Sequence, residues 1–513
     1  MGEMNMRYVK GEDRNQYNMV PMSLDDYIED DNICRVIDAF VDSLNLVTMG
    51  FKYAQPNDLG RPPFNPGDML KLYTYGYQHR IRSSRRLQKE TQRNVEVMWL
   101  LNGLTPDDKT ISNFRTDNKK ALKEVFRMFN QLCIDLELFG KRTVSVDGSK
   151  IKANNSRNNC HTEKSINKQL SRIDKHITEY MNELELNDIK ERNEPRLNEN
   201  VVKQALEILE KQKAEAEDIL ERIKEKDGKG VSIIDEDSSL MKLSGGKGFD
   251  ACYNVQTSVD EEHGLIVDFK ASSSGNDLSE LSEMVELTHE MLESKEINVL
   301  ADSGYCSGKE IEKSTELGAT CYIPKPEASH QPEDEKYHRK NFKYDKENDC
   351  YICPAGKILV NVRTRERDGF KVYANREACM SCTVKSKCTK SKTLRQIERS
   401  PNQELIDKAS ENVKKNPGLY RRRQELSEYP FGVVKRIWGY DQFLCRGREK
   451  VEGELSLTFL AFNMRRAINI LGVEKVLKAI REKSLNLEKT SKNLLNWVFT
   501  TRRVVKTPFA RAG

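Results

Sequence analysis

Two long heptad runs lie within residues 157–230, a stretch that is rich in Glu and Lys and has almost no glycine. The first run consists of Ile166, Leu170, Ile173, Ile177, Tyr180 and Leu184, and the second of Val202, Ala205, Leu209, Gln212, Ala216, Ile219 and Ile223. Steps that alternate between three and four residues place such side chains along one seam of a helix. Pro195 lies between the runs and would end a helix. The pattern therefore predicts an antiparallel coiled-coil hairpin.

Segments typical of β-strands flank this hairpin, so the hairpin is predicted to be an insertion. TVSVDGSKIKA (residues 143–153) precedes it, and GFDACYNVQTSVDEEHGLIVDFKAS (residues 248–272) follows as two strands joined by a polar turn. A helix capped by Asp277, a strand ending in Asp302, a short helix and the strand ATCYIPKP complete the order. Strand, strand, strand, helix, strand, helix, strand is a ribonuclease-H-like order. It predicts an α/β fold with a mixed sheet.

The pair Asp147-Gly148 has two interpretations. Between alternating residues, an Asp-Gly pair is a strong signal for a hairpin turn. In the predicted sheet, however, the first and fourth strands are neighbours, so Asp147 and Asp302 would converge at one edge. Two carboxylates that close repel each other unless a cation lies between them, and oxygen ligands favour Mg²⁺ or Mn²⁺. This second hypothesis makes Asp147 a ligand in a site for displacement at phosphorus.

A third carboxylate is expected from a late helix, and Glu428 follows a helical stretch that is rich in arginine. Tyr420, Arg423 and Lys435 flank it at roughly helical spacing. Taken alone, Glu428 has a simpler interpretation as a surface residue that pairs with neighbouring arginines. Taken with the two strand-end aspartates, Glu428 is predicted to complete the metal site.

Composition predicts a soluble, cytosolic protein without a membrane segment. Charged residues make up 32% of the chain, and the mean hydropathy is −0.72. No apolar run approaches the roughly 20 residues of a membrane helix. The net charge of +5 neither requires nor excludes a nucleic acid partner. Arg82, Arg85 and Arg86 belong to a local basic cluster within an all-helical region, and this cluster is either a solvated helix face or a DNA contact.

The cysteines fall into two groups. Cys350 and Cys353 form one CxxC pair, Cys379 and Cys382 form another, and Cys388 follows. Two such pairs are typical of a zinc ribbon with a structural Zn²⁺, although five cysteines leave the four ligands undetermined, and cysteines without metal are the alternative. The other seven are predicted to lie in the core: Cys34, Cys133, Cys160, Cys252, Cys306, Cys321 and Cys445.

At this point the chain resembles the DDE-type transposases of bacterial insertion sequences, in the branch with a Tyr-Arg-Glu-Lys signature. The resemblance is carried by TPDDKTISNFR in the N-terminal region, by VSVDGSKIKAN, FDACYNVQTSVD and VLADSGY, and by EYPFGVVKRIWGYDQFLCRGREKVEGELSLTFLAFNMRR. It implies a metal-binding triad of Asp147, Asp302 and Glu428. It also implies phosphate contacts by Tyr420, Arg423 and Lys435, although four residues separate Arg423 from Glu428 where the family has three.

The resemblance implies a bacterial, cytoplasmic and nucleoid-associated enzyme that acts on double-stranded DNA. Its substrates would be transposon terminal inverted repeats and target DNA, cut and joined with Mg²⁺ or Mn²⁺ by a homodimer in a synaptic complex. Lys150 and Lys152, beyond the first aspartate, are expected to face DNA. A ribonuclease-H-like nuclease without strand transfer and a catalytically inactive DNA-binding derivative are the alternatives.

The predicted organisation has seven parts. In chain order these are an N-terminal helical DNA-binding domain (1–140), the first catalytic strand (141–156), the inserted hairpin (157–230), the catalytic core (231–328), a Cys-rich zinc-ribbon-like insertion (329–399), a helical block with the third acid (400–475) and a basic C-terminal tail (476–513).

Overall fold

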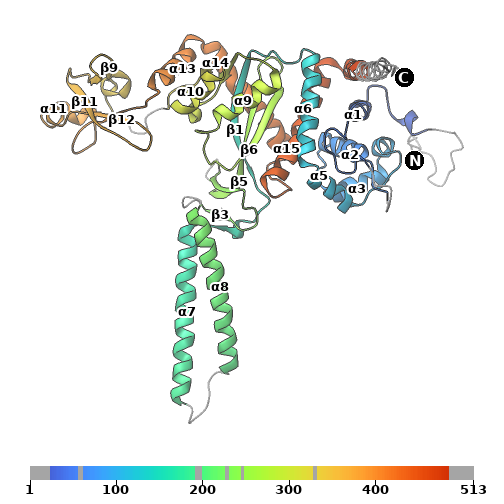
Figure 1. Cartoon of the computed structure of the whole chain (residues 1–513), viewed down its shortest axis with the longest axis horizontal. Coiled ribbons are helices and arrows are strands. Elements are labelled where there is room, and N and C mark those ends of the chain that lie inside the picture. The colour runs from blue at the N-terminus through green and yellow to red at the C-terminus, as the bar shows by residue number, and fades with distance from the viewer. Residues whose placement is uncertain are drawn as a thin grey trace, which may run out of the picture. The chain divides into compact units, whose positions relative to one another are not determined.

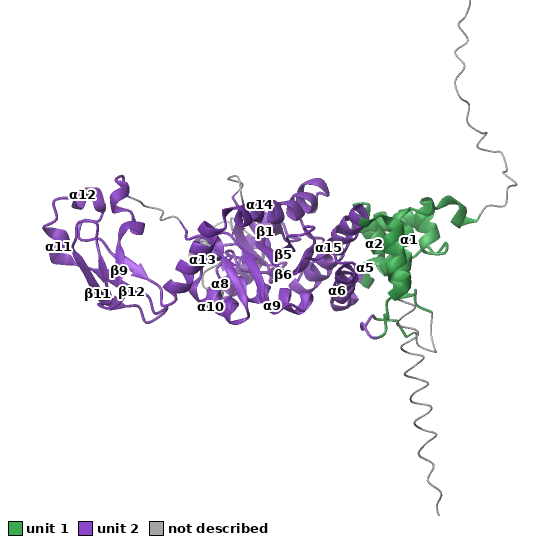
Figure 2. Ribbon diagram, turned by 90° about the horizontal axis from the view of Figure 1, so that it is seen from above, with its two compact units in different colours: residues 1–47, 52–114, 471–513 green, residues 48–51, 115–470 purple. Residues whose placement is uncertain are grey.

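The computed structural model describes residues 23–55, 62–190, 199–225, 230–243, 248–326 and 332–483. These residues form two compact units (Figure 2). Unit 1 takes its described residues from 1–47, 52–114 and 471–513, and unit 2 takes them from 48–51 and 115–470. Pro195 and most of the predicted basic tail lie outside the described residues.

Unit 1 is helical, as predicted for this part of the chain. Its N-terminal elements are η1 (Leu24–Tyr27), α1 (Ile33–Asp42), α2 (Pro66–Gln78), α3 (Ser84–Arg93), α4 (Val95–Leu100) and most of α5 (Asp108–Asp117). Asparagine side chains cap three of these helices: Asn32 accepts a hydrogen bond from the Cys34 N–H, Asn65 from Gly67 and Asn94 from Glu96. Helix α2 is buried along nearly its whole length and forms the centre of the unit.

Unit 2 is built on a mixed sheet that contains every strand predicted for the core. Its strands are β1 (Thr143–Lys152), β4 (Ser239–Lys242), β5 (Phe249–Asp260), β6 (Ile266–Ser272), β7 (Ile297–Leu300) and β8 (Ala319–Tyr322). The order is β4-β5-β1-β7-β8, and β6 also pairs with β5. β1, β7 and β8 are parallel to one another, whereas β5 is antiparallel to β1, β4 and β6. The first and fourth predicted strands, β1 and β7, are therefore neighbours.

Helices pack against this sheet through apolar and aromatic side chains. They are α6 (Lys119–Asp135), α9 (Leu281–Leu292), η4 (Ser303–Tyr305), α10 (Gly308–Glu316), α13 (Gln403–Lys415), α14 (Pro417–Phe431), η7 (Gly432–Ile437) and α15 (Arg448–Leu471). Phe269 of β6 meets Phe126 of α6 and Phe459 of α15 edge to face, and all three rings are buried. Helix α14 contacts β1 and β5, which places it over the centre of the sheet.

Two long helices separate β1 from the rest of the sheet, where the sequence predicts an inserted hairpin. Helix α7 (Glu163–Lys190) and helix α8 (Glu199–Glu225) lie side by side (Figure 1), between η2 (Arg157–Asn159) with β2 (Cys160–His161) and β3 (Val231–Ser232). Ile166, Ala216 and Ile223 are buried together, and Lys213 forms an ion pair with Asp174 at 2.7 Å. These contacts join the start of α7 to the end of α8, so the helices are antiparallel.

The cysteine-rich segment forms a small antiparallel sheet with its own core. Its elements are η5 (Glu335–Tyr337), η6 (Arg339–Asn341), β9 (Lys343–Asp345), β10 (Cys350–Ile352), β11 (Ile358–Thr364), β12 (Lys371–Ala374), α11 (Arg376–Met380), α12 (Lys385–Cys388) and β13 (Ile397–Arg399). The strand order is β13-β12-β11-β10-β9. The core of this sheet consists of Phe342, Tyr351, Leu359, Tyr373 and Ile397.

Outside this segment, five of the seven remaining cysteines are buried as predicted. Cys160 and Cys306 are only half-buried, so the core prediction is wrong for these two. Within the described ranges, no helix combines the length and the apolar character needed to cross a membrane.

Candidate active site

Asp147 lies inside β1, and the hairpin interpretation of Asp147-Gly148 is therefore wrong. Ser145 of β1 is in register with Leu300, the last residue of the parallel strand β7, and Asp147 and Asp302 each follow two residues later along the chain. Asp302 caps the turn η4, where its Oδ1 accepts a hydrogen bond from the Gly304 N–H at 2.7 Å. Parallel pairing thus brings the two aspartates to the same edge of the sheet.

The surroundings of Asp147 raise the pKa of its carboxyl group. Burial raises the pKa of Asp147 from 3.8 to about 6, and the negative charge of Asp302 acts in the same direction. The N–H of Gly148 donates to Asp147 Oδ1 at 2.9 Å and, with Arg423 and Ser427, opposes this increase in the pKa. Asp147 is therefore a carboxylate whose ionised form is costly in the absence of a cation.

Helix α14 places Tyr420 and Arg423 beside these two aspartates. Pro417 occupies the first turn of the helix, where its missing N–H costs no hydrogen bond. The Ser145 hydroxyl donates to the carbonyl of Arg423 at 3.4 Å, and the Tyr420 hydroxyl donates to the carbonyl of Ala301 at 3.2 Å. The Arg423 guanidinium lies 5.7 Å from the centre of the Tyr420 ring. Two of the three predicted phosphate contacts, Tyr420 and Arg423, therefore lie next to β1 and the residue that follows β7.

Glu428 lies on the same helix, but its side chain is exposed. Gln424 Nε2 donates to Glu428 Oε1 at 3.0 Å, one helical turn away. Ser427, which interacts with Asp147, precedes Glu428, so Glu428 points about 100° further around the helix. The hydrogen bonds and ion pairs found in the described ranges do not connect Glu428 with Asp147 or Asp302. The structure thus brings two of the three predicted acids together and leaves the third facing solvent.

Lys435 contacts the first strand directly beyond Asp147. It lies in the π-helical turn η7, a geometry that often occurs at functional sites. Lys435 Nζ donates to Ser149 Oγ at 3.1 Å and to the carbonyl of Lys150 at 2.8 Å, and burial lowers its pKa. Lys150 Nζ donates to the Lys242 carbonyl at 3.2 Å, and Lys152 lies 3.8 Å from Asp250. Lys152 is therefore partly neutralised by an acidic neighbour.

Asp277, which the sequence suggests only as a helix cap, lies beside both aspartates. Asn254 and Gln256 of β5 donate to its Oδ1 at 2.8 and 2.7 Å. A Cβ atom on Gly148 would lie 2.7 Å from Asp277 Oδ1, and one on Gly304 would lie 2.9 Å from Asp302 Oδ1 and 3.6 Å from Asp277 Oδ2. The amide residues at alternate positions of β5 are the sequence signal that could have identified this neighbour. We call Asp147, Asp277 and Asp302 the carboxylate site.

The carboxylate site has the donor chemistry of a magnesium site, because it offers only oxygen ligands on adjacent backbone segments. As the side chains stand, no group of three or more His, Cys, Asp or Glu residues within the described ranges has the geometry of a metal site. The placement of Asp147 and Asp302 at matching positions beyond the paired residues Ser145 and Leu300, with Asp277 nearby, fits a divalent cation here, since such an ion would offset the negative charges.

The predicted basic cluster of Arg82, Arg85 and Arg86 lies in unit 1. Arg85 and Arg86 are exposed on α3, whereas Arg82 is half-buried before the helix begins. Arg85 Nε lies 3.3 Å from Asp108. Arg86 and Arg85 therefore present guanidinium groups to solvent, and one of the two is paired with a carboxylate.

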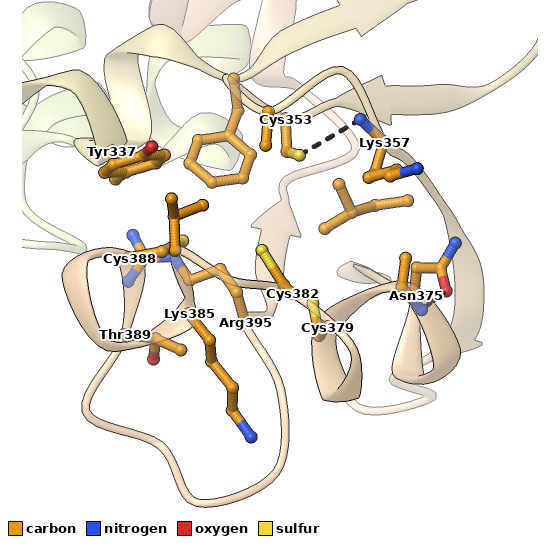
Figure 3. Close-up of a pocket in the computed structure, with 15 residues that line it drawn as sticks. Tyr337, Cys353, Lys357, Asn375, Cys379, Cys382, Lys385, Cys388, Thr389 and Arg395 are labelled. Carbon is orange, nitrogen blue, oxygen red and sulfur yellow. Dashed lines mark hydrogen bonds between the residues drawn. The ribbon is translucent and has the colours of Figure 1, made fainter.

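The cysteine cluster is separated along the chain from the carboxylate site. Cys353, Cys379, Cys382 and Cys388 line one pocket, whereas Cys350 does not (Figure 3). Burial raises the pKa of Cys388 above its ordinary value, and the other three thiols that line the pocket act in the same direction. The four sulfur atoms are therefore neighbours.

A mixed sheet with acidic residues on adjacent segments, next to an arginine-rich helix, is an arrangement suited to metal-dependent chemistry at phosphorus. Comparison with family models is consistent with this chemistry. Residues 352–468 match the Transposase DDE domain, and residues 22–117 match the Transposase domain (DUF772). These matches indicate a transposase and support the DDE type. No curated protein and no solved structure matches the chain.

Proposed function

We propose that the chain is a DDE transposase that binds the ends of an insertion sequence and catalyses metal-dependent strand cleavage and strand transfer. The observation that carries this proposal is the pair Asp147, within β1, and Asp302, just beyond the end of the neighbouring strand β7, next to α14. Helix α14 belongs to the segment that resembles the Transposase DDE domain, whereas the two aspartates precede that segment. The strand order and pairing support a ribonuclease-H-like arrangement of the catalytic core.

The proposed catalytic residues are Asp147, Asp302 and Glu428, which would hold Mg²⁺ or Mn²⁺. When bound, such ions activate a water or a DNA 3′-hydroxyl and stabilise the leaving oxygen. Glu428 must turn from solvent toward the aspartates to take part. Asp277 is held in place by Asn254 and Gln256 and supplies a further carboxylate beside the two strand-end acids.

The basic residues around the carboxylate site are proposed to bind the DNA backbone. Arg423 and Lys435 approach β1 from α14 and η7, and Tyr420 orders the loop after β7 through the Ala301 carbonyl. A cation beside a carboxylate pair is suited to a phosphate group that arrives with its metal ions. Lys150 and the cluster of Arg82, Arg85 and Arg86 would contribute sequence-independent phosphate contacts.

The remaining parts of the proposal concern the biological setting. We infer that the enzyme belongs to the Tyr-Arg-Glu-Lys branch and acts in a bacterial cytoplasm on nucleoid DNA. Its partners would be terminal inverted repeats and target DNA, and two copies would act together because both ends must be processed in one event. The helical parts of 1–140 and the α7–α8 hairpin are the proposed contacts for DNA or for the second copy.

An excision assay tests the proposed function. A plasmid carrying the gene's own locus with its flanking DNA is scored for loss of the element in the presence of wild-type protein, Asp147→Asn or Glu425→Gln. Glu425 is the matched control, because it is exposed on α14 and has no proposed role. Excision by wild type and Glu425→Gln but not by Asp147→Asn supports the proposal. Equal behaviour of wild type and Asp147→Asn, with binding of the flanks retained, indicates an inactive DNA-binding derivative instead.

A further inference from the structure

Four of the five clustered cysteines surround a single pocket in the small antiparallel sheet. Cys353 follows β10, Cys379 lies in α11, Cys382 follows α11 and Cys388 ends α12. All four side chains contribute to the wall of this pocket (Figure 3), and Cys353 and Cys388 also pack against the core of the sheet. Segments that are far apart along the chain thus bring four thiols to one place.

Strand alternation excludes Cys350 from this group. Successive side chains of a strand point to opposite faces, and Tyr351 points into the core of the sheet. Cys350 is paired directly with Val360 of β11, whose side chain is 53% exposed. Residues paired in this way share a face. Cys350 therefore belongs to the face opposite the core, whereas Cys353 packs against the core.

The backbone around Cys353 forms a tight turn that directs an N–H group at its sulfur. The Gly356 N–H donates to the Cys353 carbonyl at 2.8 Å, which closes a tight turn with a positive φ of 75° at Gly356. In this turn the Lys357 N–H donates to Cys353 Sγ at 3.3 Å. Metal-bound cysteine sulfurs accept hydrogen bonds of this kind, so the turn holds Cys353 in a position suited to a ligand.

Charge around the pocket also favours an anionic cluster. Lys357, Lys385 and Arg395 line the pocket together with the cysteines. Arg395 Nε is shielded from solvent and has no hydrogen-bond partner among the described residues. An unpaired buried N–H costs free energy. Four thiolates around a divalent cation carry a net negative charge, so they would supply the acceptor that this guanidinium lacks.

We propose that Cys353, Cys379, Cys382 and Cys388 bind one structural Zn²⁺ and that Cys350 is not a ligand. Four sulfur ligands and no open position are typical of structural zinc. Since no three potential ligands within the described ranges already meet in metal-site geometry, the thiol side chains must rotate toward the centre of the pocket. The ion would join the β10–β11 turn to α11 and α12.

The need for such an ion follows from the size of the core. The buried cluster at the core of this sheet is small, with Phe342, Tyr351, Leu359, Tyr373 and Ile397 at its centre, and small domains with few buried residues commonly depend on metals or disulfides. A zinc ion would therefore stabilise this segment independently of the carboxylate site. The proposal does not rest on catalysis, so it can fail while the transposase proposal stands, and the reverse also holds.

Metal content of the purified full-length chain tests the proposal. Elemental analysis is expected to give one zinc per chain for wild type and for Cys350→Ser, and close to none for Cys382→Ser or Cys388→Ser. Cobalt substituted into wild type and Cys350→Ser should give the absorption spectrum of a tetrahedral tetrathiolate site. Iron or no metal in wild type, or equal zinc loss in Cys350→Ser and Cys382→Ser, would overturn the assignment.

A second measurement avoids the risk that a variant fails to fold. The native wild-type chain is alkylated with and without a zinc chelator, and each cysteine is quantified by mass spectrometry. Cys353, Cys379, Cys382 and Cys388 are expected to become reactive together, and only after the chelator is added. The proposal is wrong if these four react fully before chelation, or if the chelator changes the labelling of Cys350 alone.

Discussion

Asp147 is a carboxylate that folding places next to a second carboxylate in a partly buried position. Its pKa is raised by burial and by Asp302, so the folded chain binds this proton more tightly than the unfolded chain. Because of this raised pKa, the free energy of unfolding falls as the pH rises from 3.8 to about 6. Above that range the decrease in the free energy of unfolding is complete and stays constant.

The variant Asp147→Asn lacks this titration. In metal-free buffer at pH 7.5, its free energy of unfolding should exceed that of wild type by up to about 3 kcal/mol, and at pH 4 the difference should nearly vanish. Urea unfolding of both proteins across this pH range measures the difference. Added Mg²⁺ should stabilise wild type and not the variant. A difference independent of pH would show that folding does not raise the pKa of Asp147.

A Cβ atom at Gly148 would force neighbouring side chains to move. A Cβ would lie 2.3 Å from Gln256 Nε2 and 2.7 Å from Asp277 Oδ1. Gly148→Ala should therefore lower the free energy of unfolding by about 1–3 kcal/mol and displace the side chains around Asp147. Gly418→Ala is the control, because no atom lies within 4 Å of its Cβ and alanine favours a helix. Thermal unfolding compares the two, and equal melting temperatures would refute the argument.

At the scale of elements, a buried ion pair fixes α6 to the edge strand β6. Asp268 is fully buried and is bound by Lys123 and Arg127 of α6. Lys123→Met would remove one of the two cations bound to this carboxylate and leave Arg127. The substitution should lower the free energy of unfolding by about 3 kcal/mol at neutral pH. Lys120→Met on the exposed side of α6 should change stability by less than about 0.5 kcal/mol. Chemical denaturation measures both, and similar effects would contradict the role of the pair.

The regular elements could be predicted from the sequence because each depends on a local pattern. The heptad runs at Ile166 and Val202 determine which face of each long helix is buried, and the β-branched residues of TVSVDGSKIKA favour a strand, although residues 143–146 are all buried and show no alternation. The direction of the Glu428 side chain depends on how α14 is rotated against β1, which no local pattern specifies. The place of Asp277 depends on a loop that approaches Gly148 and Gly304 from outside the strands. Such tertiary relations require the structure.

Short elements were also missed for a physical reason. β2, β3 and β4 span only two to four residues each, so they carry too little alternation to be recognised. The clustered cysteines show what a recognised strand would have added. Had β10 been predicted, the alternation around Tyr351 would have placed Cys350 and Cys353 on different faces of the sheet. Strand register, more than residue identity, determines which members of a motif can act together.

The whole molecule combines the helical unit 1 with unit 2, which is built on the mixed sheet. The carboxylate site, α14 and η7 belong to unit 2, and the α7–α8 hairpin and the cysteine-rich sheet are inserted into it. We propose above all that Asp147 and Asp302 form a site for metal-dependent cleavage of DNA. Both aspartates belong to unit 2, so the proposed site does not depend on how the two units are arranged.

Cleavage of a labelled duplex that carries one end of the gene's own locus tests this claim most directly. The rate is measured for purified wild type, Asp302→Asn and Glu425→Gln, with Mg²⁺ and with EDTA. The account predicts cleavage by wild type and Glu425→Gln only with Mg²⁺, and a rate at least about 100-fold lower for Asp302→Asn. Cleavage by Asp302→Asn at the wild-type rate, or cleavage that continues in EDTA, would contradict it.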